Sequence, residues 1–263
     1  MLKCQKNILF VTTIAILLFS YLIHIQNQKY LKNRCINSTI CIYNEKKGVS
    51  GSGVIVRSEK INSLYYNVVI TSAHLTSEDK RLNLSGYEVK IPIFEKSKIL
   101  YYEKYPCFIY ETNETCDLGV VIFSSSRRLE CSNVNFCQNL EIDDKIMKIG
   151  YGLGDDLRID RGDITSVCTS LNDKENLYRM NAFTIFGDSG GPVFYNYKLV
   201  GITCGIRSSG ILNNIYNMSY ARPINDLKNW KKELNNIEFA YDHSKKIPKI
   251  PIYFLEFNNW TIK

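Results

Sequence analysis

The order of apolar and polar residues divides the chain into two unlike parts. Residues 8–25 form one nearly unbroken apolar run, ILFVTTIAILLFSYLIHI. After residue 38 the apolar residues occur in short runs rich in β-branched and aromatic side chains, and turn residues separate these runs. Examples are YYNVVIT, YEVKIPIF, LGVVIF and KLVGITCGI. Runs of this kind predict β-strands, so the pattern indicates an all-β barrel or sandwich behind an apolar N-terminal segment.

One helix is predicted near the end of the chain. It is expected over residues 223–235, where Ile224, Leu227 and Trp230 recur at helical spacing behind a proline. Residues 238–263 contain KKIPKIPIYFLEF, whose two prolines disfavour a helix. This segment is expected to be an extended tail lying on the domain.

The apolar run at residues 8–25 has the length of a membrane-spanning helix. At the usual rise per residue it would extend roughly 27 Å, close to the hydrocarbon thickness of a bilayer. No small-residue cleavage signature follows it. We therefore predict a signal anchor within residues 1–30, with a cleaved signal peptide as the alternative. Either way the protein is expected in the secretory pathway, as a membrane-anchored or a secreted protein.

Cysteines and glycosylation motifs agree with an exported domain. Eight cysteines follow the apolar run, and this even number predicts up to four disulfides. Proximity along the chain suggests the pairs Cys35–Cys41, Cys107–Cys116, Cys131–Cys137 and Cys168–Cys204. Glycosylation is permitted at five N-x-S/T sequons, which are Asn37, Asn83, Asn113, Asn217 and Asn259.

Charge and metal-ligand residues argue against two classes of partner. The net charge is +7, but the lysines and arginines are scattered, so a basic solvated surface is expected and nucleic-acid binding is not. The histidines stand far apart, at His24, His74 and His243, and the sequence contains no Cys-x-x-Cys motif. Neither a metal site nor a cofactor is therefore expected.

Three segments carry candidate chemistry. TSAHL places His74 directly after an apolar run, ETCDLGVVIF places Asp117 directly before another, and FGDSGGPVF places Ser189 between glycines. A serine hydroxyl becomes a good nucleophile when an imidazole accepts its proton and a carboxylate orients that imidazole. The flanking glycines let the N–H groups of Gly187 and Ser189 form an oxyanion hole. These residues therefore form a candidate catalytic triad.

The segments also carry a family resemblance. Together with GSGVIV at 51–56 and LVGITCG at 199–205, they resemble the motif series of chymotrypsin-fold, trypsin-like serine proteases. The resemblance covers roughly residues 40–235. It implies a serine endopeptidase in which His74 acts as general base and then acid, Asp117 orients it, and Ser189 forms an acyl-enzyme with a protein or peptide substrate.

The same resemblance implies an architecture. Two antiparallel β-barrels are expected, with the active site between them and a C-terminal helix packed on the second. The first barrel would comprise residues 35–130 and carry the histidine and the aspartate. The second would comprise residues 131–237 and carry the serine. Oligomeric state is left open.

The sequence departs from digestive trypsins in two places. No Ile/Val-x-Gly-Gly start precedes GSGVIV, so Asp188 has no N-terminal ammonium group as an obvious partner. His74 is followed by Leu75, where a cysteine is usual in those enzymes. In these respects the chain resembles the short bacterial stress-type and viral trypsin-like peptidases. An active conformation that needs no activating cleavage is expected.

The resemblance also assigns a substrate pocket. Its lining would come from five residues, which are Phe183, Thr184, Thr203, Cys204 and Gly205, with Met218 at the base. No acidic residue stands six positions before the serine, and GITCG contains no histidine. An apolar or mid-sized side chain is therefore expected before the cleaved bond.

Two other functions share parts of this pattern. A catalytically silent homologue could serve as a binding module, although all three triad residue types are present. An esterase or lipase could use GDSGG as a G-x-S-x-G elbow, but that elbow joins a strand to a helix in α/β proteins. The β-rich pattern and the order His, Asp, Ser favour the protease.

Overall fold

The computed structural model describes residues 2–75, 86–95, 98–113, 116–154, 156–169, 176–208 and 214–225. The predicted C-terminal helix falls almost wholly outside these residues, and the predicted tail at 238–263 falls wholly outside them. Between Thr39 and Pro223 the described residues form β-strands, short 3-10 turns and loops.

The first half of the β region forms a closed six-stranded barrel. Its strands are β1 (Thr39–Asn44), β2 (Val49–Ile61), β3 (Leu64–Thr71), β4 (Glu88–Glu95), β5 (Lys98–Asn113) and β6 (Leu118–Ser125). They pair antiparallel in the order β1-β2-β3-β6-β5-β4, and β4 closes on β1. Two 3-10 turns, η1 (Glu45–Lys47) and η2 (Ala73–Leu75), follow β1 and β3.

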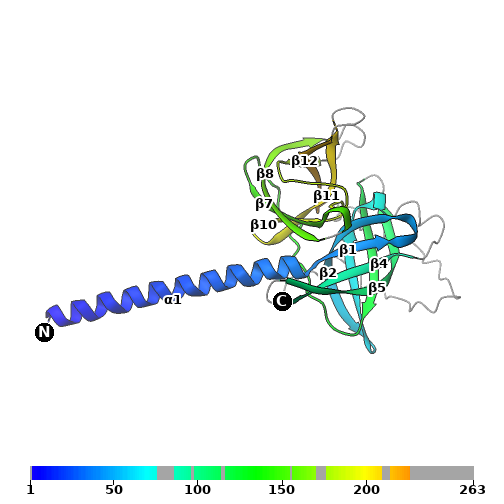
Figure 1. Cartoon of the computed structure of the whole chain (residues 1–263). Coiled ribbons are helices and arrows are strands. Elements are labelled where there is room, and N and C mark those ends of the chain that lie inside the picture. Colours follow the sequence, from blue (N-terminus) through cyan, green and yellow to red (C-terminus); the bar gives the residue numbers. More distant parts are fainter. Residues whose placement is uncertain are drawn as a thin grey trace.

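The second half forms a barrel of the same kind. Its strands are β7 (Lys145–Tyr151), β8 (Leu157–Thr169), β9 (Asn176–Met180), β10 (Pro192–Tyr195), β11 (Lys198–Ser208) and β12 (Asn214–Pro223). Their order is β10-β11-β12-β9-β8-β7, and the turn η3 (Gly152–Gly154) joins β7 to β8. The predicted pair of antiparallel β-barrels is confirmed, and Figure 1 shows the two side by side.

Alternating side chains build three apolar cores from these strands. In β3, Val69 points into the first barrel, whereas Val68 and Ile70 face the second barrel. There they pack in one cluster with Ile149 of β7 and Phe194 of β10. A third core fills the second barrel. Since successive strand residues face opposite sides, a strand buried on both sides is apolar throughout, which explains the unbroken runs in the sequence.

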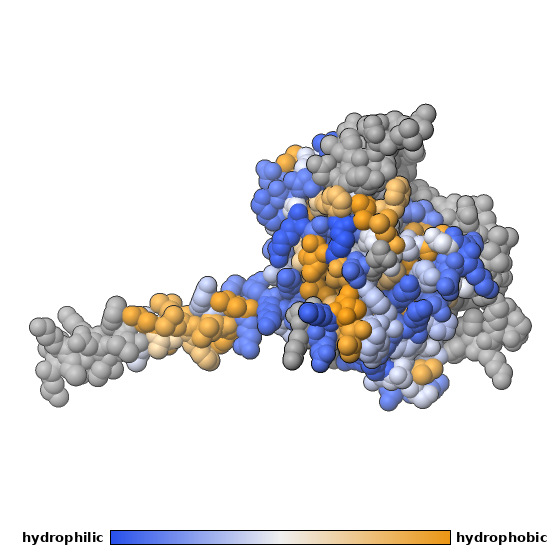
Figure 2. Space-filling model, viewed as in Figure 1, coloured by the Kyte–Doolittle hydropathy of each residue, from blue (hydrophilic) through white to orange (hydrophobic). Residues whose placement is uncertain are grey.

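A single long helix precedes the barrels. Helix α1 (Leu2–Asn37) projects away from them in Figure 1, and its C-terminal end packs against them through the buried side chain of Cys35. Farther out its apolar side chains are exposed, as the orange stretch in Figure 2 shows. Among the residues that the structure describes, no helix combines the length and apolar character needed to cross a membrane.

The three short-range disulfides predicted from the sequence are not formed. Cys35, Cys107, Cys131 and Cys137 carry free thiols. The predicted partners are held apart, because Cys107 packs against the core of the first barrel whereas Cys116 belongs to the core between the barrels. Nearness along the chain therefore did not bring the sulfur atoms together. The fourth predicted pair involves Cys168, whose side chain lies outside the described part.

Candidate active site

His74 and Asp117 meet at one edge of the first barrel. His74 lies in η2 directly after β3, and Asp117 directly precedes β6. Because β3 and β6 are antiparallel neighbours, with Thr71 opposite Gly119, the end of one strand adjoins the start of the other. The imidazole Nδ1 lies 2.9 Å from Oδ2 and 3.0 Å from Oδ1 of the carboxylate.

Backbone contacts hold the pair in place. The N–H of His74 donates to Oδ1 of Asp117 at 2.9 Å, and the N–H of Ala73 donates to its carbonyl oxygen at 3.2 Å. Asp117 has a φ of 50°, a left-handed conformation that costs energy for a residue with a side chain. With Nδ1 facing the carboxylate, Nε2 is the nitrogen available to accept a proton.

The loop that carries Ser189 lies against the strand end that leads to His74. The carbonyl of Ser189 accepts from the N–H of Ser52 at 2.7 Å, and the N–H of Gly190 donates to the carbonyl of Thr203 at 2.7 Å. A Cβ atom on Gly190 would lie 2.2 Å from Oγ1 of Thr71 and 3.0 Å from the nitrogen of Ser72. The serine loop therefore lies close to Thr71 and Ser72, which precede His74 by three and two residues.

The predicted oxyanion-hole glycine is held in a defined orientation. Gly187 has a φ of 94°, and a Cβ there would lie 2.5 Å from the carbonyl oxygen of Tyr151, so only glycine fits. The carbonyl of Phe186 accepts from the N–H of Leu153 at 2.6 Å, and the carbonyl of Gly187 accepts from Oγ of Ser52 at 2.8 Å. Since the peptide unit is planar and trans, the Gly187 N–H points away from Leu153.

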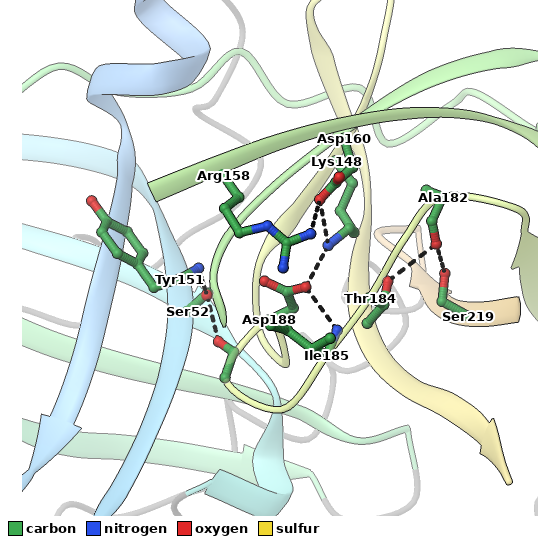
Figure 3. Close-up of polar contacts among 11 residues, drawn as sticks. Ser52, Lys148, Tyr151, Arg158, Asp160, Ala182, Thr184, Ile185, Asp188 and Ser219 are labelled. Carbon is green, nitrogen blue, oxygen red and sulfur yellow. Dashed lines mark hydrogen bonds and ion pairs between the residues drawn. The ribbon is translucent and has the colours of Figure 1, made fainter. Parts of the chain in front are cut away.

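Asp188, whose partner could not be identified from the sequence, forms an ion pair with a lysine. Both side chains are fully buried, and Nζ of Lys148 lies 2.7 Å from Oδ2 of Asp188 (Figure 3). Sequence reasoning missed Lys148 within the strand KIMKIGYG. The sequence did contain one signal. Successive residues of a strand face opposite sides, so Lys148 lies on the same face as Ile146, which points into the second barrel, while Met147 and Ile149 face the first. A lysine on that inward face is unusual, because an apolar residue is expected there.

The five predicted pocket residues differ in exposure. Thr184 and Thr203 are buried, whereas Phe183 is 43% exposed. The guanidinium carbon of Arg158 lies 4.6 Å from the centre of the Phe183 ring. Cys204 is half-buried, and a Cβ on Gly205 would meet open space. The side chain of Met218 lies outside the described part.

Two hollows on the described surface are lined by residues other than His74, Asp117 and Ser189. One, of about 630 Å³, is lined by residues of α1, β7 and β8, and the other, of about 420 Å³, lies around Cys41 and Gly154. Among the described residues, no three His, Cys, Asp or Glu side chains gather to hold a metal ion.

Comparisons with known proteins agree with this arrangement. Residues 51–202 match the family model described as a trypsin-like peptidase domain. A curated relative, the Serine protease HtrA-like of Staphylococcus aureus (strain MRSA252), is 27% identical over 231 residues. That alignment covers 77% of this chain but only 27% of the relative, so the chain spans about a quarter of that protein's length.

A solved structure shares the fold. It is described as an HtrA-type protease with a tripeptide, and it superposes with a TM-score of 0.61 at 16% identity. The match covers 80% of this chain and 64% of that one. The matched family segment includes His74, Asp117 and Ser189, and it extends over more than half of the chain. The chain therefore belongs to the trypsin-like peptidase family, a family of proteases.

Proposed function

We propose that the protein is a serine endopeptidase that cleaves peptide bonds through an acyl-enzyme on Ser189. The observation that carries this proposal is the contact of His74 Nδ1 with both carboxylate oxygens of Asp117, at 2.9 and 3.0 Å. This contact leaves Nε2 as the proton acceptor, and the serine loop lies against the strand that ends beside the histidine.

The proposed reaction uses these groups in turn. Oγ of Ser189 attacks the scissile carbonyl carbon while Nε2 of His74 accepts the hydroxyl proton. Asp117 stabilises the imidazolium cation that forms, and the N–H groups of Gly187 and Ser189 donate to the developing oxyanion. His74 then protonates the leaving amine. Water hydrolyses the acyl-enzyme by the same sequence of proton transfers.

An apolar residue before the cleaved bond is the proposed substrate preference. Phe183 occupies the position where an acidic residue would favour lysine or arginine, and Gly205 faces open space. Phe186, beside the oxyanion loop, is 63% exposed, and Leu153 next to it is 65% exposed. Exposed apolar groups around a site favour apolar ligands. Profiling with a peptide library tests this preference, and dominant cleavage after arginine or lysine would contradict it.

Labelling with a fluorophosphonate probe tests the nucleophile. The full-length chain is expected to react covalently, and Ser189→Ala is expected to abolish the reaction because the attacking oxygen is gone. His74→Ala should lower the labelling rate by orders of magnitude. Ser126→Ala, at an exposed serine after β6, is the matched control and should react like the unaltered chain.

The alternative is a catalytically silent protease homologue that serves as a binding module. It predicts that the folded, unaltered chain does not react with the probe and releases no product from a peptide library. Labelling that persists in Ser189→Ala would place the nucleophile elsewhere. Either result would overturn the proposed mechanism.

A further inference from the structure

A charged lysine stands where the second barrel should be apolar. Lys148 in the middle of β7 is fully buried, and so is Asp188, its partner. Taking two charges out of water is costly, and close pairing only partly repays that cost. The hydrolytic mechanism uses neither charge directly. The pair therefore needs a separate explanation.

Asp188 holds the serine loop in a compact turn. Its Oδ2 accepts from the N–H of Ile185 at 3.0 Å, and its own N–H donates to the carbonyl of Ile185 at 3.1 Å. Its carbonyl accepts from the N–H of Gly191 at 2.9 Å. Asp188 stands between Gly187 and Ser189, whose N–H groups are the proposed oxyanion donors. Any movement of Asp188 therefore moves both donors.

Lys148 ties this turn to the rigid barrel. It belongs to a strand that pairs with β10, with Lys148 opposite Val193. The carboxylate lies so close to β7 that a Cβ on Gly150 would be 2.7 Å from Oδ1 of Asp188. The other oxygen, Oδ2, lies 2.7 Å from Nζ of Lys148. The ammonium group is thus the charged contact between the turn and the barrel.

A second carboxylate holds the lysine from the opposite side. Nζ of Lys148 lies 3.4 Å from Oδ2 of Asp160 in β8, and Nη2 of Arg158 donates to the same oxygen at 3.0 Å. Figure 3 shows this chain of charges, from Arg158 through Asp160 and Lys148 to Asp188. Because Lys148 is held from both sides, its position does not depend on the loop alone.

We infer that Lys148 is a positioning residue which, through Asp188, keeps the N–H groups of Gly187 and Ser189 in the catalytic arrangement. The cation belongs to the barrel itself, so no cleavage of the chain is needed to supply one. This inference rests on the proposed serine-protease function and adds a requirement for the Lys148–Asp188 contact.

Replacement of the lysine by a neutral side chain of similar length tests the inference. In the full-length chain, Lys148→Met is expected to slow fluorophosphonate labelling at least about tenfold, since misplaced oxyanion donors stabilise the transition state poorly. With 4-nitrophenyl acetate the loss should appear in kcat, while KM changes less than about twofold. Lys145→Met is the matched control, because Lys145 lies on the same strand but its side chain is 80% exposed. It should label at the unaltered rate.

A double variant separates positioning from stability. Lys148→Met leaves the Asp188 carboxylate buried without its cation, whereas Lys148→Met with Asp188→Asn removes both charges. The thermal unfolding temperature should recover in the double variant, but the labelling rate should stay low because the charged contact is still missing. If the labelling rate recovers together with the unfolding temperature, the pair is only structural and the inference is wrong.

The labelling results also distinguish a failure of the inference from a failure of the proposed function. If the unaltered chain is labelled and Lys148→Met is labelled as fast, the inference fails while the proposed function stands. If the unaltered chain is not labelled at all, the proposed function fails and the inference fails with it. Intact mass is measured before and after labelling, and labelling confined to a cleaved form would also overturn the inference.

Discussion

Asp117 shows how one residue can accept backbone strain to orient another. Its left-handed φ turns the carboxylate back toward His74, where it meets both the backbone N–H and Nδ1 of that residue. An asparagine could keep the shape of the side chain, but its NH₂ group can donate to Nδ1 and favour the wrong tautomer.

Asp117→Asn should therefore lower kcat by roughly a thousandfold to ten-thousandfold, with the fold intact. Steady-state kinetics on a peptide substrate would measure the loss, and circular dichroism would verify folding. Asp163→Asn, at a carboxylate paired with the exposed Lys145, is the control and should keep kcat. A variant that retains more than about a tenth of the activity would argue against the assigned role of Asp117.

Thiol reactivity offers a second prediction at the residue scale. Burial raises the pKa of the Cys35 thiol to about 12 and that of Cys131 to about 11, so both are almost wholly protonated at pH 8. Cys137 is exposed. Iodoacetamide at pH 8 should therefore modify Cys137 well before Cys35 or Cys131, as peptide mass spectrometry would show. Recovery of any of these three in a disulfide from the non-reduced protein would contradict the free thiols.

At the scale of elements, one ion pair links β5 to the segment after β6. Nη2 of Arg127 and the hydroxyl of Tyr105 each donate to Oε2 of Glu103 at 2.8 Å. Burial raises the pKa of Glu103, but the hydrogen bonds from Arg127 and Tyr105 and the positive charge of Arg127 together outweigh burial, so the pKa lies below its ordinary value of about 4.5. The folded state therefore gains stability from this group above that ordinary pKa.

This contribution should be lost as the pH falls through the lowered pKa of the folded state. Glu103→Gln is expected to reduce the free energy of unfolding at pH 7 by less than about 1 kcal/mol, because the pair is partly exposed. Once the pH lies below that lowered pKa, the difference should shrink toward zero. Urea unfolding over a pH series from 7 downward measures this, with Glu95→Gln, at an exposed glutamate, as control. A penalty that grows on acidification would refute the assignment.

At the scale of the whole molecule, α1 raises the question of attachment. Its exposed apolar side chains, such as Ile16, Leu17 and Phe19, belong to the run predicted from the sequence to anchor the chain. If residues 8–25 are an anchor, the full-length protein should remain with membranes after alkaline extraction and should retain its first residues. A mature N-terminus beyond residue 25 would indicate a cleaved signal peptide. A soluble protein that keeps its first residue would contradict both.

The sequence by itself determined the strand pattern and the candidate chemistry. In a strand that is buried on both faces, all successive side chains are apolar, and this pattern can be seen within a few residues. Runs such as YYNVVIT therefore predicted strands that the structure contains. The residue types around His74, Asp117 and Ser189 are equally local, because each motif sits within a few positions. These signals sufficed for the fold class and for the family.

Only the tertiary structure decided which distant groups meet. The partner of Asp188 is a lysine forty positions away on another strand, and no local pattern pairs them. Three of the four cysteine pairs inferred from chain proximity were wrong for the same reason, since barrel closure sends neighbours such as Cys107 and Cys116 into different cores. No local pattern says that Thr184 and Thr203 are buried while Phe183 is 43% exposed. Burial and long-range pairing arise only when the barrels close and pack, because these interactions depend on distances in space.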